Sequence, residues 1–171
     1  MVDHSHMNHL LSIAIAPLFL IYLTATSPAD DQQQRLSELD TYWAKVSRAV
    51  GGGDFEAYKA TCHPTAVLVS GTKKTSYPLA QALKRWKAEF DDTKAGIRKS
   101  SVTFRFAHRF GDATTAHESG IFLYSFQPAG GTLKKEYVHF EALLVNQAGE
   151  WKIMMEYQKS SATEIEWDEL K

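Results

Sequence analysis

The sequence predicts an α+β fold in which helices come first and an antiparallel sheet follows. Residues 30–50 and a segment that begins at Pro78 carry apolar side chains at helical spacing. Four long segments between residues 98 and 159 are rich in β-branched and aromatic residues. The last two flank a short turn with one glycine, which is typical of a hairpin. At 171 residues, 44% apolar and 23% charged, the chain should form one globular domain.

The helices are justified by their apolar stripes and their ends. The stripe of the first helix consists of Leu36, Leu39, Trp43, Val46 and Val50, and three glycines at 51–53 should end it. Asp54 is placed to cap a short second helix, which His63-Pro64 stops. Pro78 suits the first turn of a third helix, whose apolar side is formed by Leu79, Leu83, Trp86 and Phe90.

The strands follow from the alternation of side chains and from the turn residues. A short strand is expected at 66–71, and a polar loop at 73–77. The long strands are expected at 98–110, 113–126, 133–145 and 151–159, and a short helix at 162–170 should close the chain. Gly111-Asp112 predicts a tight turn between the first two long strands, and Gln147-Ala148-Gly149 predicts a three-residue loop between the last two.

The N-terminus has the pattern of a secretory signal peptide. Residues 10–25 are mostly apolar and uncharged, and Ser27-Pro28-Ala29 places small residues before a cut at Asp30. The expected division is a signal peptide at 1–29 and a single domain at 30–171, located in the periplasm or secreted. No stable membrane span should remain after cleavage, because the apolar run is removed with the signal peptide. The run is also shorter than a spanning helix needs. A retained membrane anchor is the alternative.

Charge and cysteine content exclude some functions. The formal net charge is −1 and no basic face is evident, so nucleic acid is not an expected partner. Cys62 is the only cysteine, so no disulfide can form within the chain. No cofactor motif is present, and we expect no cofactor.

The segment at 53–69, Gly-Asp-Phe-Glu-Ala-Tyr-Lys-Ala-Thr-Cys-His-Pro-Thr-Ala-Val-Leu-Val, and the Gly-Glu-Trp-Lys-Ile end of the last hairpin carry a family resemblance. Together with the order of elements, they resemble the nuclear-transport-factor-2-like superfamily, and within it the SnoaL-like and ketosteroid-isomerase-like branch. The resemblance implies a cone-shaped fold with a strongly curved antiparallel sheet, whose concave face is covered by the N-terminal helices. It also implies an internal cavity, but one such fold hosts many functions.

Strand pairing then places a polar cluster in that cavity. The turns put Phe104 opposite Ser119, Ser119 near Glu141, and His139 opposite Tyr157, which gives all of them one face. We assign this face to the concave side. Glu141 and His139 are the candidate catalytic residues, because burial would raise the pKa of Glu141 and lower that of the histidine, and such shifts suit acid–base work near neutral pH. The candidate ligand-binding residues are His117, Ser119, Tyr157, Phe104, Phe106, Trp86 and His63.

The expected function is an exported domain that binds a small apolar or amphipathic molecule, with an isomerase, dehydratase or cyclase activity as one outcome. The alternative is a non-catalytic domain for ligand binding or protein interaction, in which the polar cluster only satisfies itself inside the core. His117, His139 and Glu141 are possible metal donors, but no local ligand spacing supports a site, and we predict none.

The opposite face of the sheet predicts a homodimer. In this register it carries an apolar patch of Phe122, Val138, Phe140 and Leu144, on the side away from the helices. Large exposed apolar patches usually mark an interface, and a two-fold dimer would cover this one with its own copy.

Overall fold

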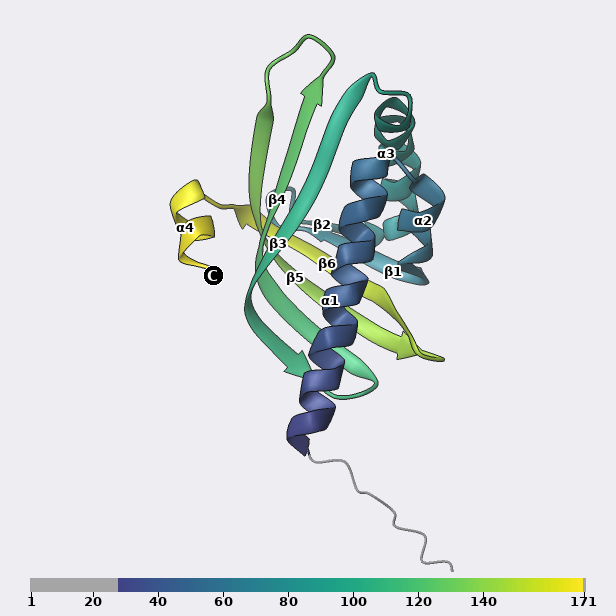
Figure 1. Ribbon diagram of the computed structural model, residues 1–171, viewed down its shortest axis with the longest axis vertical. Coiled ribbons are helices and arrows are strands. Elements are labelled where there is room, and N and C mark those ends of the chain that lie inside the picture. Colours follow the sequence, from purple (N-terminus) through teal and green to yellow (C-terminus); the bar gives the residue numbers. More distant parts are fainter. Residues whose placement is uncertain (1–27, 171) are drawn as a thin grey trace, which may run out of the picture.

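The computed structural model describes residues 28–170, in which three helices cover one face of a bent six-stranded sheet (Figure 1). The signal peptide predicted at 1–29 lies almost wholly outside these residues. The elements in chain order are α1 (Pro28–Gly52), α2 (Phe55–Ala60), β1 (Cys62–Ser70), β2 (Thr75–Pro78), α3 (Leu79–Lys94), β3 (Arg98–Gly111), β4 (Thr115–Pro128), β5 (Lys134–Gln147), β6 (Glu150–Ser161) and α4 (Glu164–Glu169). Within the described part of the chain, no helix is long and apolar enough to cross a membrane.

The sheet has the strand order β2-β1-β6-β5-β4-β3. All neighbours pair antiparallel except β1 and β6, which run parallel. The predicted α+β class and curved sheet are confirmed, with two differences. The polar loop expected at 73–77 contains strand β2, and β1 begins at Cys62 rather than at residue 66.

The helices form where their apolar stripes and caps predict them. Leu39, Trp43 and Val46 of α1 are buried against the sheet. Asp54 caps α2 through its side chain, which accepts a hydrogen bond from the backbone nitrogen of Ala57 at 3.0 Å. Gly53, between α1 and α2, has a φ of +64°, and a Cβ there would lie 2.4 Å from the backbone nitrogen of Lys94. Only glycine fits this junction of α1, α2 and α3.

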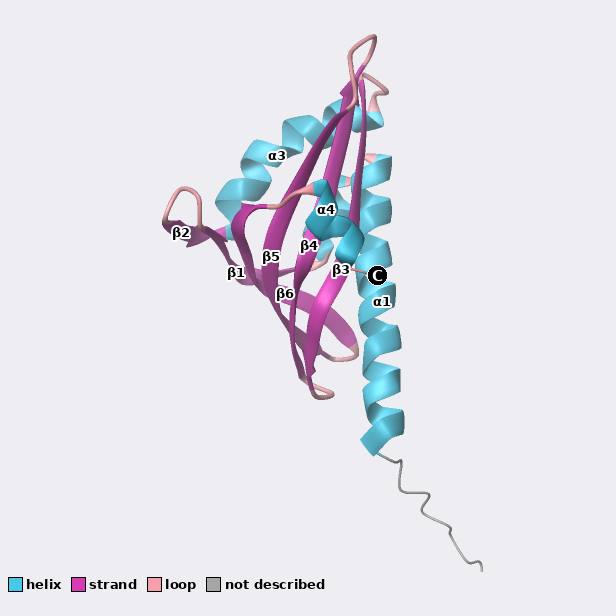
Figure 2. Cartoon of the chain, turned by 90° about the vertical axis from the view of Figure 1, so that its left-hand side faces the viewer, coloured by secondary structure: helices cyan, strands magenta, loops and turns pink. Residues whose placement is uncertain are grey.

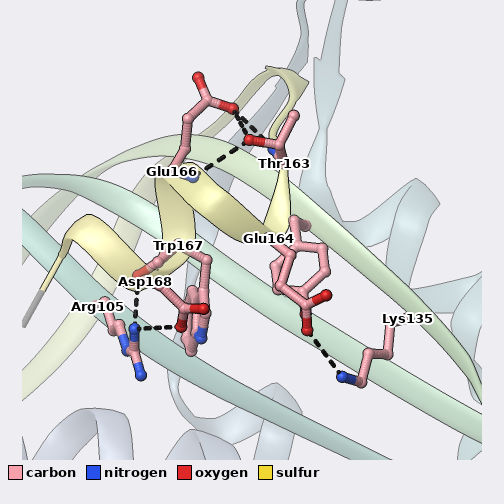
Figure 3. Close-up of polar contacts among 8 residues, drawn as sticks. Arg105, Lys135, Thr163, Glu164, Glu166, Trp167 and Asp168 are labelled. Atoms are coloured by element: carbon pink, nitrogen blue, oxygen red, sulfur yellow. Dashed lines mark hydrogen bonds and ion pairs between the residues drawn. The ribbon is translucent and has the colours of Figure 1, made fainter.

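The opposite, outer face of the sheet carries α4, which lies in front of the strands in Figure 2. A capping box between Thr163 and Glu166 begins this helix. Trp167 is buried, and the guanidinium of Arg105 lies 4.5 Å from the centre of its ring. Arg105 also donates to the carbonyl of Trp167 at 2.6 Å, and Lys135 pairs with Glu164 at 3.1 Å (Figure 3). α4 is therefore fixed to β3 and β5 by packing and by charge.

The predicted register between β3 and β4 was wrong. Phe104 lies opposite Phe122, not Ser119, a shift of three residues. Two features cause it: the turn after Gly111 is longer than predicted, and β3 has an irregularity between Phe106 and His108. Asp112 holds the longer turn, because its carboxylate accepts from the backbone nitrogens of Thr114 and Thr115.

An odd shift exchanges the two faces of a strand. The predicted pairing of β4 with β5 is confirmed, since Ser119 lies opposite Glu141 and Ile121 opposite His139. The side chains of β4 and β5 therefore point to the face opposite to the predicted one, whereas those of β3 do not. The β5–β6 turn also differs: Ala148 and Gly149 have φ values of 54° and 84°, and Gln147 pairs with Glu150 across this two-residue turn. A shift in pairing before Met155 then puts Tyr157 opposite Glu141.

The apolar patch that predicted a homodimer lies on the inner face. Phe140 and Leu144 are fully buried in the core, and Phe122 and Val138 face the helices. The assignment of this patch to the outer face was wrong, because it depended on the same incorrect β3–β4 register. Dimerisation itself stays a prediction, now without the surface that motivated it.

Candidate functional site

A cavity of about 290 Å³ lies between the helical layer and the inner face of the sheet. α1, α2 and α3 form one side of it, and β1, β3, β4, β5 and β6 form the other. Nine of its lining side chains are aromatic: Tyr42, Trp43, Tyr58, Trp86, Phe90, Phe104, Phe122, Tyr124 and Phe140. An apolar cavity of this kind, with a few polar groups, is the usual form of a small-molecule site.

Trp43 stands at the centre of the aromatic wall. Its ring centre is 4.4 Å from that of Phe104 and 5.8 Å from that of Phe140. Its indole nitrogen donates a hydrogen bond to Glu118, a fully buried carboxylate on β4. Arg109 donates to the same carboxylate and reaches Asp40 of α1 at 2.6 Å. This ion-paired cluster fixes the orientation of Trp43 and ties α1 to the sheet.

Glu156 of β6 places a half-buried carboxyl group in the wall of the cavity. Gln158 on the same strand donates to its Oε1 at 2.7 Å. Burial raises the pKa of Glu156, and the hydrogen bond from Gln158 offsets this only in part. A raised pKa moves a carboxyl group toward the range in which general acid–base catalysis is most efficient.

Tyr58 of α2 brings a hydroxyl group to the same cavity. Its ring packs against Phe90 and Trp86, and within residues 28–170 the hydroxyl has no hydrogen-bond partner. Burial and then the charge of Glu156 raise the pKa of Tyr58 well above its usual value, so it remains a proton donor. The hydroxyl of Tyr42, in contrast, donates to the carbonyl of Thr61 at 3.3 Å.

Cys62 also lines the cavity, but it is not suited to nucleophilic attack. Burial raises the pKa of its thiol to about 12, so the reactive thiolate is scarce at neutral pH. Among the described residues, no three or more His, Cys, Asp or Glu side chains are grouped so as to hold a metal ion.

The rim of the cavity carries a second polar group. Tyr124 donates to Glu89 Oε2 at 3.0 Å and accepts from Arg98 Nη2 at 3.1 Å. Arg98 also pairs with Glu89 at 3.4 Å. Glu89 is 46% exposed and Glu136 is exposed, which places both at the opening. This network joins the last turns of α3 to β3 and β4.

The structure places only part of the predicted site in this cavity. Trp86 and Phe104 line it, and Phe106 packs against Trp43 with ring centres 5.7 Å apart. His63 lies at the hairpin end of β6, where Gln147 contacts it at 3.0 Å. The other predicted residues lie on the outer face, four of them on the inverted strands β4 and β5 and Tyr157 on β6 opposite Glu141: His117, Ser119, His139, Glu141 and Tyr157.

On that outer face, Ser119 and His139 line a second pocket between the sheet and α4, together with Lys159 and Glu166, and several of the charged residues form ion pairs. Glu141 accepts from Lys159 at 2.7 Å and contacts His117 at 3.3 Å. The hydrogen bond from Lys159 lowers the pKa of Glu141, the opposite of the rise that a buried position would cause. His139 contacts Glu166 of α4 at 3.2 Å. Their cavity placement was therefore wrong, because it depended on the β3–β4 register.

Sequence reasoning did not single out Glu156 and Gln158. They alternate with Met155 and Tyr157 along β6, and the predicted register gave the inner face to the latter pair. The signal that could have found them is the spacing of two residues between Glu156 and Gln158, which puts both polar side chains on one face of β6. This spacing is informative only when it is known which face of β6 points toward the helices.

Burial of Glu156 should cost stability at neutral pH. Because the folded chain binds this proton more tightly than the unfolded chain, stability falls as pH rises from the ordinary glutamate range through the raised pKa. We expect Glu156→Gln to melt roughly 2–4 °C above wild type at neutral pH, the shift produced by about 1 kcal/mol. Below the ordinary pKa of glutamate the difference should vanish. Thermal melts across pH measure this, and a variant less stable at neutral pH would contradict it.

Comparison with known proteins supports the fold. No family model and no curated protein matches this sequence. Among solved structures, a candidate scytalone dehydratase from Novosphingobium aromaticivorans aligns with a TM-score of 0.61 and 11% identity, over 79% of this chain and 89% of that one. A ketosteroid isomerase-like protein from Erwinia carotovora atroseptica aligns with a TM-score of 0.54 and 14% identity, over 72% and 94%.

A third similar structure is a candidate association domain of calcium/calmodulin-dependent protein kinase II from Xanthomonas campestris. It has a TM-score of 0.54 and 16% identity, over 82% of this chain and 94% of that one. These likenesses define the fold class: a cone-shaped, nuclear-transport-factor-2-like α+β domain. The resemblance predicted from the sequence is confirmed at the level of the fold.

Proposed function

We propose that this protein binds a small, largely apolar molecule in the cavity and acts on it by acid–base catalysis. The observation that carries the proposal is the pair formed by Glu156 and Tyr58. A carboxyl group with a raised pKa and an unpartnered phenol face one aromatic cavity. The named neighbours that are isomerase-like or dehydratase-like support a reaction of this class.

The two groups suit complementary steps. Glu156, when ionised, can take a proton from a carbon next to a carbonyl group, and its protonated form can return the proton at another position. The hydroxyl of Tyr58 can donate a hydrogen bond to the carbonyl oxygen, where negative charge develops in the transition state. The aromatic walls exclude water and orient a flat ligand. Isomerisation, dehydration and cyclisation can all begin with this proton transfer.

Proton abstraction can be tested before the natural substrate is known. Tetralone, a two-ring ketone with acidic hydrogens, serves as the probe in deuterium oxide, and magnetic resonance follows the exchange. We expect the wild-type protein to accelerate exchange beside the carbonyl. If tetralone binds without any acceleration, the alternative gains: a non-catalytic binding domain, which the similarity to a kinase association domain also favours.

We also propose that the protein is exported, on the basis of the uncharged run at 10–25 and the small residues before Asp30. N-terminal sequencing of the native protein should begin at or near Asp30. Ala29→Arg, which puts a large charged residue directly before the cut, should leave the leader attached. Soluble cytoplasmic protein that retains Met1 would contradict export.

A further inference from the structure

The charge of the cavity lining is one-sided. Its described residues include the three glutamates Glu89, Glu136 and Glu156, but no lysine, arginine or histidine. The whole chain is nearly balanced, with 19 basic and 20 acidic residues besides 7 histidines. The imbalance is therefore local to the cavity, and it disfavours an anionic ligand.

The aromatic walls of the cavity also favour a cationic ligand. The faces of aromatic rings attract cations. In the described residues, six contacts between a basic side chain and a ring are present, and they use the rings of Phe55, Tyr77, Phe106, Phe126 and Trp167. None of these rings lines the cavity. The nine rings that do line it have no cation from the described chain.

Glu156 lacks a counter-charge in its half-buried position. Among the described residues, the only side chain that hydrogen-bonds to it is the neutral Gln158, and no basic group acts on its pKa. A buried carboxylate is costly unless it is paired. A cation brought in by a ligand would supply the missing partner.

The rim is arranged to admit a positive charge. Glu89 and Glu136 stand at the opening. Arg98 is not a lining residue: its guanidinium lies 4.4 Å from the ring centre of Phe126 and bonds to Glu89 and Tyr124, so Glu89 already has one basic partner. Glu136 at the mouth and Glu156 inside have no basic partner among the described residues, and they would attract a cation along this path.

The volume limits the size of the ligand. A protein cavity of about 150 Å³ accommodates benzene. The present cavity, at about 290 Å³, therefore suits a body of about two fused rings.

We propose that the ligand of this cavity is an organic cation: an amine with an apolar body of about two rings, whose ammonium group pairs with Glu156. The inference rests on the proposed function, since it uses the same cavity, and it names the class of ligand. The rings of the cavity wall surround the apolar body, and the carboxylate of Glu156 holds the charge.

Three probes of one shape separate charge from shape: naphthylmethylamine, naphthylmethanol and naphthoic acid, each titrated into the full chain by calorimetry. We expect the amine to bind about tenfold to a hundredfold tighter than the alcohol, the range that a charge-assisted hydrogen bond supplies. The acid should bind most weakly. Amine binding should release protons, seen by repeating the titration in buffers of different ionisation enthalpy, because the ammonium group favours ionised Glu156.

Glu156→Gln should remove most of the preference for the amine and leave binding of the alcohol unchanged. Glu150→Gln, at an exposed glutamate paired with Lys152, is the matched control and should keep the preference. The comparison of the three probes on the wild-type protein needs no variant, so it tests the cation inference even if Glu156→Gln fails to fold. Equal binding of amine and alcohol, or tighter binding of the acid, would overturn the cation inference and leave the cavity as a binding site. Failure of all three probes to bind would overturn the proposed function as well.

Discussion

Replacing Phe140 with glutamate is expected to unfold the protein. The side chain is 2% exposed and packs against Trp43, Phe104 and Phe122. Removing a buried phenylalanine alone costs about 3–5 kcal/mol. A charge placed there without a partner adds several more. Together these approach the roughly 5–15 kcal/mol that a domain of ordinary stability has. Circular dichroism and chemical denaturation should show a largely unfolded variant.

Leu143→Glu is the matched control on the same strand. Leu143 points to the outer face and is 39% exposed, so a charge there remains in water. We expect the variant to fold with a free energy of unfolding within about 1 kcal/mol of wild type. The face assignment predicted from the sequence requires the reverse: it puts Phe140 on the outer face, and therefore Leu143, an odd number of residues further along the strand, on the inner face. A folded Phe140→Glu protein beside an unfolded Leu143→Glu protein would therefore restore that assignment.

The helical part of the fold could be predicted because its signals are local. The stripe from Leu39 to Val46, the cap at Asp54 and the glycines after α1 each act within a few residues. The formation and the ends of the helices depend mainly on the spacing of apolar residues and on backbone sterics. The structure confirms these helices, and the order of the long strands with them.

The side of the sheet to which each side chain points was harder to predict. The face of each strand is inferred from its pairing with the previous strand, so an error in one register is passed on to the next strand. Gly111-Asp112 is a valid tight-turn signal, but the carboxylate of Asp112 stabilises a longer turn instead. The irregularity after Phe106 leaves no mark in the sequence that alternation alone can detect. A single odd shift then carried Glu141 and His139 to the outer face, although their own pairing with β4 was correct.

The choice of catalytic carboxylate shows how this error reaches function. The sequence predicts that a glutamate in the cavity, next to a second polar group, would favour an enzyme. The structure places Glu156 and Tyr58 in the cavity wall and Glu141 on the outer face. The chemical requirement was inferred from general principles of acid–base catalysis, while the identity of the residue depended on a register.

Glu156→Gln is expected to reduce proton abstraction by roughly 10²–10⁴-fold, the contribution that a positioned general base supplies. The amide has the size of the carboxyl group and can still accept the hydrogen bond from Gln158, so the cavity should keep its shape. The measurement is the rate of deuterium exchange into tetralone, compared with wild type. For the wild-type rate, the profile against pH should rise through a pKa above the ordinary range of glutamate, because burial raises that of Glu156. The variant should lose this limb of the profile.

Glu141→Gln is the control that separates the two carboxylates. Glu141 lies on the far side of the sheet, ion-paired with Lys159, and has no route to a ligand in the cavity except through the sheet itself. Its replacement should leave both the exchange rate and the pH profile unchanged. If Glu141→Gln slows exchange while Glu156→Gln does not, the reaction takes place on the outer face and the cavity has another use. If neither substitution affects exchange, proton abstraction does not depend on a glutamate at either position, and Tyr58→Phe becomes the deciding variant for the cavity.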